Sequence, residues 1–230
     1  MSLAPLQPPG QVICGGMSYK AHNEELAAIV RIPDEIKGFP FFFVKAQRAI
    51  NRHEAPIILP DITSLIRKPF DPPYGQVTGE VELGIVIKDR TYRVKPQEVH
   101  QHILGYTVFN DISQRDLQLA GYPVSMTKGF HTFGPLGPHM VTADSIPEPQ
   151  KLRFELGVNG TARQKGSLSD MLFSIETLVS LASQIFMLER GDVITTGSPP
   201  EMFGYRLQPG DVIEAEIESI GILRNPVVSQ

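Results

Sequence analysis

In the stretch Glu80-Val81-Glu82-Leu83-Gly84-Ile85-Val86-Ile87, two carboxylates separated by one residue lie within an apolar run. On a β-strand, side chains two apart point to the same face. The flanking Leu83, Ile85 and Val86 indicate a strand buried on at least one side, where carboxylates are costly unless a cation matches them. An isolated acidic pair would instead be read as the solvent-facing side of an edge strand. The apolar setting favours a strand face that holds a metal.

A third carboxylate follows about thirty residues later, in Phe109-Asn110-Asp111-Ile112-Ser113. Three carboxylates supply hard oxygen ligands, which suit Mg²⁺, Mn²⁺ or Ca²⁺ better than zinc. Such a set leaves coordination positions open for water and a chelating substrate. The candidate metal ligands are therefore Glu80, Glu82 and Asp111.

The composition of the chain is that of one globular domain with a short N-terminal extension. Its 230 residues, 41% of them hydrophobic, are enough for one substantial core, so we predict an extension over 1–10 and a single domain over 11–230. The net charge of −4 and the lack of a Lys/Arg run argue against nucleic acid or an anionic membrane as partner. A small soluble ligand is expected.

The cysteine count and the start of the chain bear on its cellular location. Cys14 is the one cysteine, which excludes an internal disulfide and fits a reducing cytosol; between apolar neighbours it is expected to be a buried structural thiol. Pro5, Pro8 and Pro9 interrupt the first ten residues, and no apolar run has membrane length, so a cytoplasmic protein is predicted.

The pattern along the chain predicts an α+β protein that is mostly β, with many short elements. Twenty glycines and twenty prolines favour tight turns over a helical bundle. A hairpin is predicted between 82–87 and 91–94, and helices over 18–26, 96–103 and 174–187; apolar residues in the last of these form one core-facing stripe. The further predicted strands are 11–14, 41–45, 57–59, 106–109, 152–158, 193–195, 212–217 and 221–224.

Several ordered motifs together resemble the fumarylacetoacetate hydrolase family, especially its small members that act on acylpyruvates and oxaloacetate. The resemblance runs from about Val12 to Pro226. The motifs are Gly-Glu-Val-Glu-Leu at 79–83, Gly-Tyr-Thr-Val-Phe-Asn-Asp-Ile-Ser at 105–113, Arg-Asp-Leu-Gln at 115–118, Lys-Gly-Phe at 128–130, Gly-Pro-Leu-Gly-Pro at 134–138, and the segment 188–199.

The resemblance implies a mixed β-roll or sandwich with a few flanking helices, a divalent metal, usually Mg²⁺ or Mn²⁺, and a homodimer. It makes Glu80, Glu82 and Asp111 the metal ligands, in agreement with the carboxylate argument. Lys128, with Gln118 and Thr196, matches positions that surround the bound keto acid. Lys128 can neutralise a carboxylate or a developing enolate, and the other two can form hydrogen bonds.

Other site residues are less fixed by the motifs. Tyr122 is expected to border the pocket, although its loop position leaves this open, and Thr196 can equally be a turn residue beside Gly197. His131 stands where relatives often have Asp, so it is either an extra pocket base or a space-filling residue.

The pair His22 and Glu25 has the three-residue spacing that brings side chains to one face of a helix, so Glu25 can orient His22 and raise its basicity. The resemblance implies a short His-x-x-Glu helix that folds over the metal-bound substrate and activates water. Glu24 is an alternative partner for His22. Without the motif context, His22 would be read as a surface histidine.

The predicted function is metal-dependent hydrolysis of a carbon–carbon bond in an acylpyruvate-type 2-oxo acid. His22 with Glu25 and Lys128 are the candidate catalytic residues. The same site would serve decarboxylation of oxaloacetate, which needs no attacking water. Two alternatives stay open: isomerisation or hydration of an unsaturated 2-oxo acid, and a metal-stabilised binding protein without catalysis.

Overall fold

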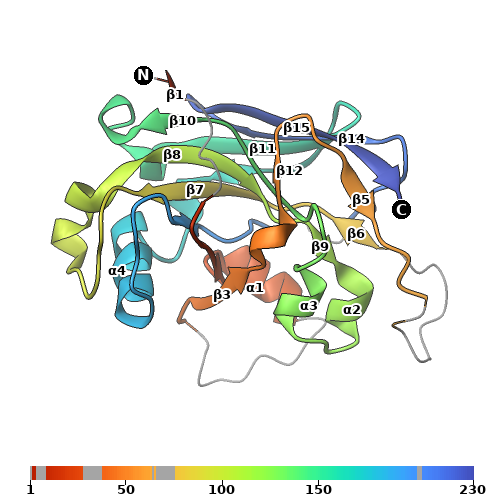
Figure 1. The fold of residues 1–230 in the computed structure, drawn as a ribbon, viewed down its shortest axis with the longest axis horizontal. Helices are drawn as coiled ribbons and strands as arrows, with labels where there is room; N and C mark the ends of the chain where they lie inside the picture. The colour runs from red at the N-terminus through yellow and green to blue at the C-terminus, as the bar shows by residue number, and fades with distance from the viewer. Residues whose placement is uncertain (1, 4–8, 28–37, 64, 66–75, 201–203) are drawn as a thin grey trace.

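The computed structural model of the chain describes residues 2–3, 9–27, 38–63, 65, 76–200 and 204–230. Two β-sheets form most of the molecule, and a few helices lie beside them, as Figure 1 shows. The expected mostly-β α+β class is confirmed. Ser2 and Leu3 pair with strand residues Val141 and Met140, while the division of the chain at residue 10 stays a prediction.

The larger sheet has eight strands and contains the predicted metal-binding stretch at its centre. β7 runs antiparallel to both β8 and β13, and all seven of its residues are buried. It is therefore covered on both faces. The strands in sheet order are β1 (Ser2–Leu3), β10 (Gly134–Thr142), β8 (Ile103–Asn110), β7 (Val81–Ile87), β13 (Val193–Thr195), β2 (Val12–Gly16) and β3 (Phe41–Lys45), with β4 (Ile50–Arg52) beside β10.

The second sheet packs against the first and closes the core. Leu156 and Ala215 from this sheet share one buried cluster with Leu83 and Ile85 of β7. Residues alternate between buried and more exposed along β11 and β14, as expected for strands covered on one face. The order is β12 (Thr161–Ser167), β11 (Arg153–Val158), β14 (Val212–Ile217), β15 (Gly221–Ser229) and β5 (Ile57–Leu59); β6 (Val77–Thr78) pairs separately with β9 (Ser113–Gln114).

The α-helices lie on one side of the strands, in the lower half of Figure 1. They are α1 (Lys20–Ala27), α2 (Arg115–Leu119), α3 (Val124–Thr127) and α4 (Ile175–Ile185); 3₁₀ turns span Gln47–Ala49, Pro96–His102, Ala143–Ser145, Pro149–Lys151 and Leu168–Asp170. Ser174 caps α4 by accepting a hydrogen bond from the Thr177 N–H at 3.1 Å. Within the described ranges, none of the helices has the length and hydropathy needed to cross a bilayer.

Two of the predicted elements differ in the structure. The predicted hairpin between 82–87 and 91–94 does not form, because β8 and β13 pair with the two edges of β7. Thr91 instead forms a bridge with Leu188. The strand predicted to end at Cys14 continues through Gly15 and Gly16, which pair with Phe42 and Phe41 of β3. Cys14 is a buried free cysteine, as predicted.

Candidate metal centre

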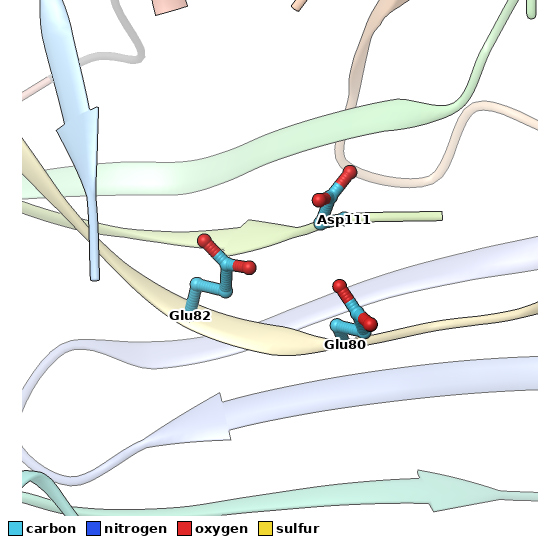
Figure 2. Close-up of side chains that lie close together, drawn as sticks. All are labelled: Glu80, Glu82 and Asp111. Atoms are coloured by element: carbon cyan, nitrogen blue, oxygen red, sulfur yellow. The ribbon is translucent and has the colours of Figure 1, made fainter. Parts of the chain in front are cut away.

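Three carboxylates converge where β7 and β8 lie side by side (Figure 2). The antiparallel register pairs Val81 with Asn110, and the Asp111 N–H donates to the Glu80 carbonyl at 2.9 Å, so the two chains stay adjacent beyond the strand ends. Glu80 and Glu82 share a face because they are two residues apart. One carboxylate oxygen from each of Glu80, Glu82 and Asp111 lies within 4.8 Å of the others.

Three cationic side chains surround this cluster inside the protein. The Lys128 Nζ lies 2.6 Å from Glu80 Oε2 and 2.5 Å from Asp111 Oδ2, and so bridges the two carboxylates. Lys45 Nζ lies 2.5 Å from Asp111 Oδ1, and Arg115 Nη2 lies 2.6 Å from Glu80 Oε1. Each of these side chains is buried. Ionised groups are retained at such depth when opposite charges match them.

The ion pairs control the protonation of Glu80 and the lysines. Burial by itself would raise the pKa of Glu80, but the charges of Lys128 and Arg115 hold it well below its usual value. Burial opposes the charge of Lys128 as well, yet Asp111 and Glu80 raise its pKa. Burial lowers the pKa of Lys45, although Asp111 counteracts this effect. The geometry thus favours an ionised Glu80 with a protonated Lys128.

Glu82 has a different environment from the other two carboxylates. Its Oε2 accepts hydrogen bonds from the Thr195 hydroxyl and from the Gly197 N–H, the latter at 3.1 Å, and no ion pair joins it to a described residue. Burial, followed by the charges of Asp111 and Glu80, raises its pKa well above the usual value. Glu82 is a buried carboxylate that lacks a cation of its own.

The donor set fits a hard divalent cation. It consists of oxygen atoms from three carboxylates that converge on one point, and one of the three has a raised pKa that a positive charge would lower. Glu80, Glu82 and Asp111 are the residues that would hold Mg²⁺, Mn²⁺ or Ca²⁺. The structure brings together the three carboxylates that were predicted to be the ligands, and their binding of a metal stays a prediction.

Two residues of the centre were not predicted, Lys45 and Arg115. Lys45 ends the apolar strand β3, a position that usually places a lysine at the surface, whereas here it is 2% exposed. Arg115 stands in one of the motifs that carry the family resemblance, and its Nε also donates to the Thr78 hydroxyl at 2.8 Å. The three-carboxylate cluster itself was the available signal, since buried acids require cations nearby.

His22 lies on α1 and is 8% exposed. Burial lowers its pKa from 6.5 to about 4, while the charge of Glu80 acts in the opposite direction. Its Nδ1 atom is buried, with no hydrogen-bond partner in the part of the chain that the structure describes. Glu25 therefore does not orient His22 through Nδ1 in this structure. The catalytic roles of both residues stay predictions.

Gln118 is brought to the centre through Arg115, whose Nη1 donates to Gln118 Oε1 at 2.8 Å. Thr196 is fully buried, and its hydroxyl accepts a hydrogen bond from the Leu83 N–H at 3.0 Å. This bond ties the segment after β13 to β7 beside Glu82. The Thr196 hydroxyl thus forms a structural hydrogen bond with β7, and substrate contact by Gln118 or Thr196 stays a prediction.

Tyr122 and His131 make contacts outside the carboxylate cluster. The Tyr122 hydroxyl donates to the Leu65 carbonyl at 3.1 Å. The His131 ring is exposed, with Nδ1 at 3.2 Å from the Arg48 carbonyl oxygen. Their predicted contacts with a substrate are not tested by these bonds.

Known proteins are similar to this chain in both sequence and fold. The family model for fumarylacetoacetate (FAA) hydrolase, C-terminal, matches residues 11–228. The mitochondrial oxaloacetate tautomerase FAHD2A of Bos taurus is 37% identical over 233 residues, which cover 98% of this chain and 69% of the relative. A protein of Methanocaldococcus jannaschii is 38% identical over 219 residues, which cover 95% of this chain and 83% of the relative.

Solved structures give the same result. The 5-carboxymethyl-2-hydroxymuconate delta-isomerase of Mycobacterium smegmatis has a TM-score of 0.79 at 34% identity, covering 97% of this chain and 80% of that one. A fumarylacetoacetate hydrolase from Exiguobacterium antarcticum has a TM-score of 0.81 at 34% identity, and the match covers 99% of this chain and 78% of that one. The family match contains all three carboxylates of the centre and nearly the whole chain, and the chain therefore belongs to the fumarylacetoacetate hydrolase family.

Proposed function

We propose that this protein is a divalent-metal-dependent hydrolase that cleaves a carbon–carbon bond in an acylpyruvate-type 2-oxo acid, and that the same site decarboxylates oxaloacetate. The observation that carries the proposal is the convergence of Glu80, Glu82 and Asp111, with the Lys128 ammonium between two of them. Members of the family are enzymes, and two of the similar proteins, an oxaloacetate tautomerase and a hydroxymuconate isomerase, are named for reactions of small organic acids.

The charges of the centre favour an anionic substrate. The three carboxylates are balanced by Lys45, Lys128 and Arg115, so these six groups sum to zero when all are ionised. A bound divalent cation would supply Lewis acidity and two positive charges. A 2-oxo acid, which carries a carboxylate and develops a second negative charge as an enolate, matches that excess. Lys128 is the donor placed to stabilise the developing charge.

His22 is the proposed base for the hydrolytic reaction. With a pKa of about 4 it is neutral at pH 7, so a ring nitrogen is free to accept a proton from water. Its burial at the cluster, within range of the Glu80 charge, supports a position close to the reacting groups. Glu25, in this proposal, aligns the ring and stabilises its protonated form once the substrate is bound.

Isomerisation of an unsaturated 2-oxo acid is the second candidate function. It is favoured by the isomerase and tautomerase names of similar proteins and by the neutral His22, since isomerisation requires proton transfer and no attacking water. Lys128 and the metal would have the same task in both reactions. The two functions therefore differ in what His22 deprotonates.

The test is a panel of acylpyruvates, oxaloacetate and unsaturated 2-oxo diacids, supplied with Mg²⁺ or Mn²⁺, with the products identified. We expect cleavage of an acylpyruvate and its loss in Lys128→Met. Lys151→Met is the matched control, because Lys151 forms an exposed ion pair with Glu148 away from the centre. Conversion of unsaturated diacids without any cleavage would replace hydrolysis by isomerisation as the function.

The proposal includes a cytoplasmic homodimer. The family resemblance supports the dimer, and the single buried Cys14 is compatible with a reducing compartment. Sedimentation of the purified protein tests the dimer, and fractionation of the source cells tests the location.

A further inference from the structure

Thr195 places a buried hydroxyl on an apolar face of the larger sheet. It lies on β13 two residues after Val193, so the two side chains share a face, and it is fully buried. Val193, with its strand partners Val12 and Val86, belongs to one buried apolar cluster. A hydroxyl in such surroundings is costly unless it has a partner, a cost that a valine of the same shape avoids. A threonine here therefore requires a specific acceptor.

That acceptor is Glu82. Thr195 pairs with Gly84 of β7, and Glu82 lies two residues before Gly84 on the same face. The Thr195 hydroxyl donates to Glu82 Oε2, and the Gly197 N–H donates to the same oxygen at 3.1 Å. The hydroxyl also forms a hydrogen bond with the thiol of Cys14, its register partner on β2. The Thr195 side chain is thus held between two strands and directed at one oxygen of a proposed metal ligand.

The two donors occupy a single oxygen of Glu82. A carboxylate oxygen has two lone pairs, so Thr195 and Gly197 together use the hydrogen-bonding capacity of Oε2. No hydrogen bond from a described residue reaches Oε1. In Figure 2, one Glu82 oxygen points toward Glu80 and Asp111, and the other points away from them. Glu82 is therefore presented to a cation through one oxygen.

The other two carboxylates of the centre are oriented by charged groups. Each oxygen of Glu80 and of Asp111 lies within 2.6 Å of a lysine or arginine nitrogen. Glu82 is oriented instead by a neutral hydroxyl and a backbone N–H. A substitution of Thr195 therefore changes how one carboxylate is presented without removing a charge from the centre.

We propose that Thr195 is a positioning residue that keeps Glu82 monodentate and so makes the centre favour Mg²⁺ over Ca²⁺. The inference rests on the proposed function, because it assumes that Glu82 binds the metal. Mg²⁺ requires nearly ideal octahedral geometry, whereas Ca²⁺ takes about six to eight oxygens and accepts bidentate carboxylates. Without the Thr195 hydroxyl, a lone pair of Oε2 becomes available, and Ca²⁺ gains a ligand atom that Mg²⁺ does not use.

The experiment is calorimetric titration of the EDTA-treated and dialysed protein with Mg²⁺ and, separately, with Ca²⁺. Thr195→Val keeps the shape and loses the hydroxyl, whereas Thr195→Ser keeps the hydroxyl and loses the methyl group. We expect Thr195→Val to weaken Mg²⁺ roughly 10-fold and to leave Ca²⁺ within about threefold, because support of a ligand is lost but a bidentate mode compensates only Ca²⁺. Thr195→Ser should keep the wild-type ratio of the two affinities.

Thr91→Val is the matched control. Thr91 is also a buried threonine, and its hydroxyl donates to the Asp89 carbonyl at 3.0 Å, outside the carboxylate cluster. The same substitution at this position should change neither the Mg²⁺ nor the Ca²⁺ affinity.

The outcomes separate the inference from the proposed function. An unchanged ratio of affinities in Thr195→Val, whether both cations bind normally or both are weakened equally, would overturn the role of Thr195 alone. A ratio that changes in Thr195→Ser but not in Thr195→Val would also overturn it, because the effect would then follow packing. Failure of the wild-type protein to bind either cation would overturn the proposed function together with the inference.

A crystal structure of the Mg²⁺-loaded wild-type protein provides a check that needs no substitution. We expect one Glu82 oxygen on the ion and the other still bonded to Thr195 and Gly197. Coordination of Mg²⁺ by both Glu82 oxygens would overturn the inference.

Discussion

The carboxylate cluster and helix α1 are built in opposite ways. Glu80 and Asp111 lie next to the paired ends of β7 and β8, where ion pairs hold them and Lys128 bridges them. Helix α1 has eight residues, exposes Lys20 and Glu24, and carries His22 with an Nδ1 that no described residue bonds. Two of the three carboxylates in the cluster are thus paired with cations inside the protein, whereas α1 presents a buried polar atom without a described partner.

The difference suggests a division between binding of the metal and substrate at the cluster and proton transfer from α1, as proposed above. The cluster has fixed charges in fixed places, which suits binding of a metal and an anion. An eight-residue helix has little stability of its own and depends on packing. Here the Leu172 N–H donates to the Ser18 carbonyl at 2.7 Å, and the Asn23 side chain donates to the Met17 carbonyl at 3.0 Å, so the start of the helix is anchored. In the proposed reaction, α1 supplies the base from outside the network of ion pairs.

The largest effect is expected from the two glutamates of the cluster. Glu82→Gln should abolish Mg²⁺ binding and activity, because one hard ligand is lost. It should not lower the stability of the metal-free protein, since Glu82 has a raised pKa and no cation of its own. Glu80→Gln should also abolish Mg²⁺ binding and activity. In addition, it should destabilise the metal-free protein by about 3 kcal/mol, because Lys128 and Arg115 lose their partner. Calorimetry and urea unfolding in EDTA measure the two quantities.

Equal destabilisation by both glutamate substitutions would show that the two carboxylates are not held differently. Retention of wild-type Mg²⁺ affinity in Glu82→Gln would remove Glu82 from the ligand set.

The next largest effect is expected from His22 on helix α1. His22→Ala should lower acylpyruvate hydrolysis by on the order of 10²–10⁴-fold, the usual range for a positioned base. Decarboxylation of oxaloacetate should fall less, because it needs an electron sink and no activated water, and Mg²⁺ affinity should stay unchanged. Initial rates for both substrates on one preparation provide the comparison. Small, equal losses would mean that the base lies elsewhere, with His131 the first residue to examine.

A smaller effect is expected from Gln164, which supports the cluster from β12. The Gln164 side chain is fully buried. Its Oε1 accepts a hydrogen bond at 3.2 Å from the N–H of Val81, the residue between the proposed ligands Glu80 and Glu82. Its Nε2 donates to the carbonyls of Pro199 and Pro200 at 3.2 and 3.0 Å. Gln164→Leu should weaken Mg²⁺ roughly 10–100-fold, as loss of ligand support generally does. Gln164→Glu keeps an acceptor for Val81 and should recover part of this affinity. A loss of thermal stability with unchanged Mg²⁺ affinity would assign Gln164 to the fold alone.

The smallest effect is a pH dependence that comes from His22. Its pKa is about 4 in the folded protein and 6.5 when unfolded, so the unfolded chain binds the proton between these values. Stability from the buried neutral ring is complete above pH 6.5 and falls as the pH drops toward 4. Between pH 7 and 5, metal-free wild type should lose about 2 kcal/mol more than His22→Gln. Urea unfolding at the two pH values measures this difference, and parallel losses would show that His22 is not buried as a neutral ring.

Local sequence determined those elements whose evidence lies within a few neighbouring residues. The alternation at Glu80 and Glu82 gives one face of a strand, and the apolar stripe of α4 gives a helix, so both could be predicted without a fold. The strand over Phe41–Lys45 was predicted with its observed bounds for the same reason. Residue types suggested the metal ligands, and the motifs shared with a family placed them in order.

Only the tertiary structure decided which segments meet. The partner of β7 could be chosen wrongly because any nearby strand satisfies its backbone hydrogen bonds locally, whereas the whole sheet selects β8 and β13. Lys45 is 66 residues from Asp111 and Arg115 is 35 from Glu80, so neither ion pair leaves a periodic signal in the sequence. Electrostatic attraction depends on distance in space, and the fold alone sets that distance.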